Sequence, residues 1–139
     1  MAKNNMSQWS LTLLRVVLGF VFTYHGYLKL FAPGGFTGTV NFFTFIGIPL
    51  APWSAFAVSV VEFFCGLFLI LGVVTKWSSA LLIINMLVAF FKVHLQNGFL
   101  VGKGGYEFVT ILLAGLIVIL SSGPGKLALG KLFKKKFLH

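Results

Sequence analysis

Acidic residues are nearly absent from this sequence of 139 residues: Glu62 and Glu107 stand against eleven Lys and Arg. Charged residues make up 9% of the chain, whereas a soluble domain carries about 25%. With 58% hydrophobic residues, the composition excludes an ordinary soluble globular protein. Glu62 lies within one long apolar run and Glu107 begins another. A carboxylate in that setting is costly, and its default interpretation is a functional site with a nearby partner.

Cysteine is just as scarce. Cys65 is the single cysteine, which excludes an internal disulfide, a CxxC redox pair and a thiolate zinc cluster. The histidines and carboxylates show no metal-ligand spacing such as HxxxH or ExxH, so we predict no metal site. Haem-type histidine pairs and flavin glycine motifs are missing as well. Any electron transfer would therefore need a partner that supplies the electrons.

Long apolar runs are what the sequence has in abundance. A bilayer core about 30 Å thick needs about 20 helical residues, and four segments meet or approach this length: 11–31, 53–74, 77–95 and 106–122. We therefore predict an all-α fold, a four-helix transmembrane bundle that forms a single domain over residues 1–139. The lipid bilayer is its first partner.

The first long connection contains a second, shorter helical pattern. Pro33, Gly34 and Gly35 break the first helix, and Phe36, Val40, Phe43 and Ile46 then recur at helical spacing. This pattern predicts a short helix that lies in the outer membrane interface. It is either a lid over an outward-facing pocket or a hydrophobic plug on the bundle, and we favour the plug.

Lysine and arginine set the predicted orientation. With four spans, the two termini share one side with Lys3, Lys76 and the lysines of the tail 126–139, whereas the other side holds few basic residues. The positive-inside rule then places both termini in the cytoplasm, with the chain in the plasma (inner) membrane. The tail is typical of contact with anionic lipid headgroups or of a plain topology signal, and we predict no nucleic-acid partner.

The polar residues within the spans line up at helical spacing. Arg15, His25 and Lys29 share one stripe of the first span, flanked by Gly19 and Gly26, whose small size lets helices approach closely. Each of the other spans also offers a polar or small stripe. We therefore expect these stripes to face a common interior that forms a ligand or proton pathway, with candidate residues Arg15, His25, Lys29, Glu62, Asn85, His94 and Glu107.

The estimated depths divide these candidates into two layers. Glu62 and Asn85 lie near mid-span, and we expect Glu62 to contact His25 or Arg15, because a buried carboxylate needs compensation. In a regular helix His94 would point away from Asn85.

We expect Lys29, His94 and Glu107 to converge at the outer end, beneath residues 36–46. The alternative is that the cations snorkel to the interface, that Glu107 only starts a helix, and that a Glu62–Arg15 pair only fixes helix register.

The order of several short motifs resembles the DoxX family of small four-span membrane proteins. Residues 15–30 (RVVLGFVFTYHGYLKL) resemble its opening motif, and residues 62–76 (EFFCGLFLILGVVTK) resemble its second-helix signature. The stretches 94–99, 105–107 and 123–125 follow in the family's order. One departure is 127–130, which reads Leu-Ala-Leu-Gly where the family often ends with Ser-Leu-Asp. The resemblance covers residues 15–129.

This resemblance implies a function only in outline. The family is named for a subunit of a thiosulfate:quinone oxidoreductase, and most members have no assigned reaction. We therefore hold three hypotheses: a redox-associated subunit that binds a quinone or similar lipophile, a non-enzymatic carrier or channel for a small anion or lipophile, and a scaffold for soluble redox enzymes. Under the first, His25, Lys29 and His94 would donate hydrogen bonds, and a soluble or membrane redox partner is implied. Whether the chain is an enzyme, and whether it forms a homo-oligomer, is left open.

Overall fold

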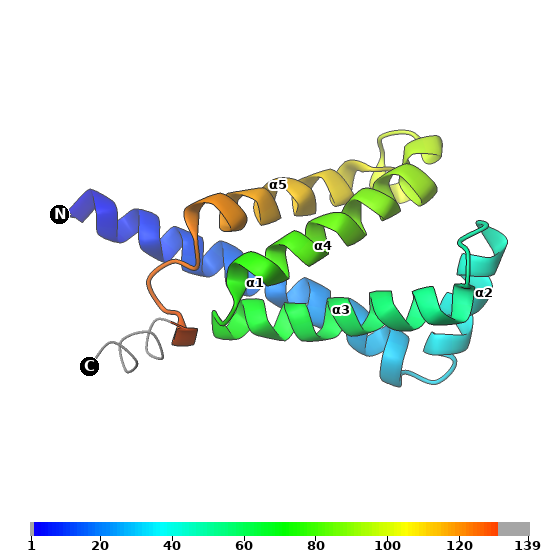
Figure 1. Cartoon of the computed structure of the whole chain (residues 1–139). Coiled ribbons are helices and arrows are strands. Elements are labelled where there is room, and N and C mark those ends of the chain that lie inside the picture. The colour runs from blue at the N-terminus through cyan, green and yellow to red at the C-terminus, as the bar shows by residue number, and fades with distance from the viewer. Residues whose placement is uncertain (1, 131–139) are drawn as a thin grey trace.

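The computed structural model describes residues 2–130, and the side chains from residue 5 onward. It is built from helices, with no strand in the described part of the chain (Figure 1). The prediction of an all-α fold is therefore confirmed. The helices are α1 (Ala2–Phe31), α2 (Gly35–Phe45), α3 (Ala51–Leu71), α4 (Thr75–Ala89) and α5 (Glu107–Ser122).

Three helical segments are long and apolar enough to cross a membrane: Asn5–Phe31, Ala51–Leu71 and Thr75–Asn97. The helix Glu107–Ser122 is apolar but shorter. These four match the predicted spans. The largest boundary difference is at α1, which begins at Ala2 and not near residue 11, because a helix can continue through polar residues beyond the apolar stretch that crosses the lipid.

Glycines bring α1 and α3 together. A Cβ atom on Gly66 would lie 2.5 Å from the backbone nitrogen of Thr23, and one on Gly19 would lie 2.7 Å from the carbonyl oxygen of Gly66. Neither position leaves room for a side chain, so the two backbones are in direct contact, as small residues allow in membrane bundles. The expected close approach at Gly19 is confirmed.

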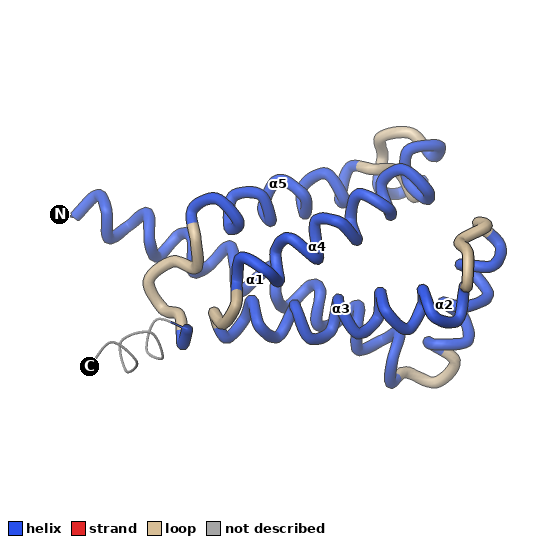
Figure 2. Tube along the Cα trace, in the orientation of Figure 1, coloured by secondary structure: helices blue, strands red, loops and turns tan. Residues whose placement is uncertain are grey.

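The helices lie close together at the end that holds the α3–α4 link and the segment 123–130, and they spread apart toward the other end (Figure 2). Figure 2 shows α3 and α4 diverging from their short link toward the end that carries α2, with α5 lying beside α4. We call these the terminal end and the α2 end. The buried apolar core ties the four long helices together and includes Leu18, Phe22, Leu69, Leu82, Leu116 and Ile119.

The short helix α2 lies across the α2 end, where it packs on α1 and α3 (Figure 1). It begins after Gly34, whose φ of 74° is the left-handed conformation that glycine adopts readily. None of its residues is buried. Phe36, Val40 and Phe43 are partly buried, so one face of α2 packs on the bundle and forms a wall of the space beneath it. Whether α2 acts as a lid or as a plug stays a prediction.

At the terminal end, the segment 123–130 folds back onto α1 and α3. The Thr12 hydroxyl oxygen accepts hydrogen bonds from the backbone nitrogens of Lys126 (2.9 Å) and Leu127 (3.3 Å). Arg15 Nη2 donates to the Leu127 carbonyl oxygen at 2.5 Å. The Arg15 side chain is therefore bound at this end of the bundle. The remaining tail lysines, Lys131, Lys134, Lys135 and Lys136, lie outside the described residues, so their predicted contact with lipid stays a prediction.

Candidate ligand cavity

A cavity of about 840 Å³ opens between the diverging helices at the α2 end. Its walls come from all five helices and from the loop between α4 and α5, and most of its lining is apolar. The size is within the range of small-molecule sites, about 300–1,000 Å³. Among its apolar side chains are Phe22, Phe42, Phe43, Val58, Met86 and Phe108.

The strongest polar cluster in this cavity is centred on Glu62. Lys29 Nζ lies 2.5 Å from Glu62 Oε2, and Asn85 Nδ2 donates to Glu62 Oε1 at 2.9 Å. The Glu62 side chain is only 5% exposed, whereas that of Lys29 is 27% exposed. Both carboxylate oxygens are thus occupied by groups from α1 and α4. Such pairing is what makes a buried charge tolerable.

The expectation that Glu62 faces a polar group of the first helix is confirmed, but the expected partner is wrong. The partner is Lys29, and neither His25 nor Arg15 bonds to Glu62. The reason is the reach of lysine: helical side chains tilt toward the N-terminus, so a long lysine placed near the outer boundary carries its ammonium deeper than its own Cα. Arg15 lies 14 residues from Lys29, about 21 Å along the helix at 1.5 Å per residue.

A π-helical turn, Phe90–His94, directly follows α4. Such turns insert an extra residue, which rotates the following side chains by about 100° relative to a regular α-helix. His94 therefore lines the same cavity as Asn85, and the prediction that it points away is wrong. Its Nδ1 atom lies 2.6 Å from the carbonyl oxygen of Gly104.

Glu107 does not take part in the cavity. Its Oε2 atom accepts a hydrogen bond from the Val101 backbone nitrogen at 2.9 Å, so it braces the loop that precedes α5. The predicted convergence of Lys29, His94 and Glu107 is therefore wrong for Glu107. Lys29 and His94 do share the cavity, whose wall includes α2 as expected.

His25 lines the cavity without a fixed partner. Its side chain makes no hydrogen bond within the described residues, and its ring contacts that of Tyr24 edge-on. Within the same residues, no group of three His, Cys, Asp or Glu side chains could hold a metal ion. A ligand in this cavity would therefore meet the two histidines, His25 and His94, and the internal Lys29–Glu62 ion pair.

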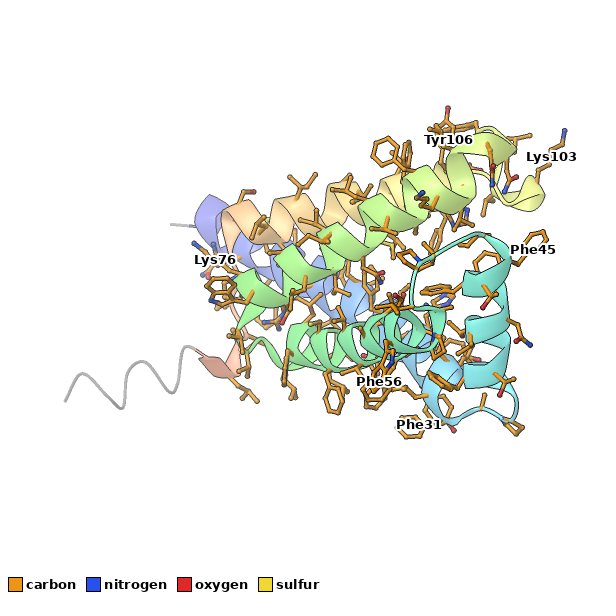
Figure 3. The ribbon with its side chains drawn as sticks, turned by 45° about the vertical axis from the view of Figure 1, so that its right-hand side comes forward. Phe31, Phe45, Phe56, Lys76, Lys103 and Tyr106 are labelled. Carbon is orange, nitrogen blue, oxygen red and sulfur yellow. The ribbon has the colours of Figure 1, made fainter. Side chains whose placement is uncertain are left out.

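Two features of this site could not be predicted from the sequence. The carbonyl oxygen of Gly104 carries no sequence signal, because every residue has such a group. The aromatic side chains of Phe42, Phe43 and Phe108 were not among the predicted site residues, yet they line the cavity (Figure 3 shows the side chains of this region). They lie on ordinary apolar helix faces, so the sequence alone could not distinguish cavity-lining side chains from core or lipid-facing ones.

Comparison with known proteins identifies the family. The DoxX family matches residues 10–95. A Bacillus subtilis protein named "Putative oxidoreductase CatD" is 32% identical over 84% of this chain and 81% of its own. An uncharacterized membrane protein of Mycobacterium tuberculosis is 31% identical over 91% of this chain and 83% of its own.

A third relative, an uncharacterized protein of Haemophilus influenzae, is 36% identical over 50% of this chain and 46% of its own, so the match spans about half of that relative. No solved structure matches the chain. The family match and the two long alignments agree with the helical bundle. The chain is therefore a membrane protein of the DoxX family.

Proposed function

We propose that this protein is a redox-associated membrane subunit that binds a quinone or a similar neutral lipophile in the cavity. One observation carries the proposal: an apolar cavity of about 840 Å³ into which a few polar groups, Lys29, Glu62, Asn85, His25 and His94, converge. Apolar walls with few polar groups are the usual design of a small-molecule site. The name of the Bacillus subtilis relative supports the association with redox chemistry.

The ion pair favours a neutral ligand over a small anion. Lys29 is the basic residue that lines the cavity, and Glu62 already neutralises it at 2.5 Å. An anion would have to displace Glu62 and leave that carboxylate buried without a counterion, which costs several kcal/mol. A neutral ring or chain needs no such exchange. The hypothesis of a carrier or channel is therefore less well supported for a small anion than for a neutral lipophile.

The polar groups suggest separate tasks within this proposal. A ligand oxygen can accept a hydrogen bond from the Lys29 ammonium, whose side chain is 27% exposed. Asn85 holds Glu62 in place from α4. The electrons come from a soluble or membrane redox partner, because Cys65 is the chain's single cysteine and carries no dithiol chemistry.

Blocking the cavity tests this function. Gly38 lines the cavity, and a Cβ atom there would meet nothing within 4 Å. Gly38→Leu should therefore fill ligand space without disturbing the bundle, and should weaken binding of decylquinone at least about tenfold, a loss of about 1.4 kcal/mol. Binding is measured by isothermal titration calorimetry on protein in lipid nanodiscs.

The matched control is Gly102→Leu, at an exposed glycine outside the cavity where a Cβ also meets nothing within 4 Å. This variant should bind decylquinone as the parent protein does. Equal binding by Gly38→Leu and the parent, or failure of the parent to bind either decylquinone or its reduced form, decylhydroquinone, would refute the proposed site.

The proposal includes an orientation in the plasma (inner) membrane. Both termini lie in the cytoplasm and the cavity faces the opposite side, because lysines concentrate at the terminal end. In a Cys65→Ala background, Lys103→Cys should react with a membrane-impermeant maleimide in intact cells, whereas Asn5→Cys should react only after lysis. The reverse labelling pattern would contradict this orientation.

A further inference from the structure

The His94 ring is held by one nitrogen. Nδ1 lies 2.6 Å from the Gly104 carbonyl oxygen, and a carbonyl oxygen can only accept a hydrogen bond, so Nδ1 carries the hydrogen. In a neutral imidazole the other nitrogen, Nε2, is then an acceptor. No backbone or side-chain group within the described residues bonds to Nε2. His94 lines the cavity, so the ring nitrogen that it has left for a ligand there is an acceptor, and the donor role expected from the sequence is reversed.

The Gly104 carbonyl oxygen, which accepts the hydrogen bond from His94, is itself held in place. Asn97 Nδ2 also donates to the Gly104 carbonyl oxygen, at 3.2 Å, and is held in turn by the Val93 carbonyl oxygen at 3.1 Å. Glu107 braces the same loop through the Val101 nitrogen. With the π-helical turn that aims the ring, these bonds set both the orientation and the tautomer of His94. In functional histidines, a hydrogen bond to one ring nitrogen commonly sets the protonation of the other in this way.

An acceptor in an apolar cavity selects for a ligand hydroxyl group. A quinone carbonyl or an ether oxygen cannot bond to Nε2, and would leave it unpaired and desolvated, which disfavours binding. The aromatic rings of Phe42, Phe43 and Phe108 line the same cavity and suit a flat ring. Lys29 can donate to a second oxygen of that ring.

We propose that the cavity binds its ligand as a hydroxyl-bearing aromatic ring, a lipophilic phenol or hydroquinone, with His94 Nε2 accepting the hydroxyl hydrogen. This deepens the proposed function and rests on it, since it names the form of the ligand that the same cavity prefers. It concerns binding alone and includes no electron transfer.

The test compares two probes that differ at the hydroxyl groups. Decylhydroquinone and its 1,4-dimethyl ether are titrated into nanodisc-embedded protein under anaerobic conditions, so that the hydroquinone stays reduced. The protein should bind the hydroquinone about tenfold more tightly, as expected when one unpaired buried acceptor is avoided. The ratio of the two affinities is the readout, because a general loss of structure would weaken both probes together.

Two substitutions separate the nitrogens of His94. The amide nitrogen of Asn can replace Nδ1 and keep the bond to Gly104, so His94→Asn should fold but lose the preference for hydroquinone. Gln reaches the position of Nε2 with an amide oxygen, so His94→Gln should keep part of the preference. Gln96→Ala, exposed and outside the cavity, should leave the ratio unchanged.

The outcomes distinguish the two proposals. If the parent protein binds both probes equally, or if His94→Asn keeps the full preference, the His94 inference is overturned while the cavity remains a lipophile site. If the parent binds neither probe nor decylquinone, the proposed function itself fails.

Discussion

Replacing Lys29 with Met should lower the free energy of unfolding by about 3 kcal/mol. Glu62 is 5% exposed and would lose its counterion at 2.5 Å, and removal of one partner from a buried pair costs about 3–5 kcal/mol because the other charge stays buried. The lower end applies here, since the Lys29 side chain is 27% exposed. Unfolding in mixed SDS and dodecyl maltoside micelles, followed by tryptophan fluorescence, measures the change.

The double variant Lys29→Met/Glu62→Gln should recover most of this loss. A Gln at position 62 carries no charge, and its side-chain oxygen can still accept the bond that Asn85 now makes at 2.9 Å. The matched control is Lys103→Met, at an exposed lysine of the α4–α5 loop that forms no ion pair within the described residues. If Lys29→Met were as stable as this control, the pair would be a surface contact and Glu62 would be compensated elsewhere.

The sequence could predict the number of spans and the face of Glu62 for physical reasons. A bilayer demands long apolar helices, and a carboxylate at mid-span must turn away from lipid toward a polar partner. Both arguments need only composition and helical spacing. The first argument holds for α1, α3, α4 and α5, and the second holds for Glu62 of α3.

The partners within the site could not be predicted in the same way. Lys29 reaches Glu62 because its long side chain extends down the helix, whereas residue depth alone favoured His25 or Arg15. His94 enters the cavity because a π-helical turn interrupts the regular spacing on which the prediction rested. Arg15 is bound by the carbonyl oxygen of Leu127, a partner 112 residues away with no signal in its side chain. Irregular backbone turns and backbone carbonyl acceptors thus determine which groups become partners in the site, and helical periodicity does not reveal either of them.

Gly26→Ala should destabilise the protein by about 3 kcal/mol, although it adds a single methyl group. That methyl would overlap the backbone nitrogen of Phe63 and lie 2.7 Å from its Cα atom. Backbone atoms cannot swing aside as a side chain can, so α1 and α3 must separate, and overpacking of this kind costs about 1–3 kcal/mol or more. Phe63 follows Glu62 directly, and Lys29 lies one turn beyond Gly26. The separation should therefore also lengthen the Lys29–Glu62 contact and weaken decylquinone binding.

Gly38→Ala is the matched control, since it makes the same change in a helix where the new methyl meets nothing within 4 Å. Alanine favours a helix over glycine by about 1 kcal/mol, so this variant should be as stable as the parent or slightly more stable. Opposite signs for the two variants, measured in the same mixed micelles, are the expected result, because the contact between backbones differs and the substitution does not. If Gly26→Ala and Gly38→Ala changed stability alike, helix propensity would govern both positions, and close packing of α1 on α3 would not be what places Lys29 against Glu62.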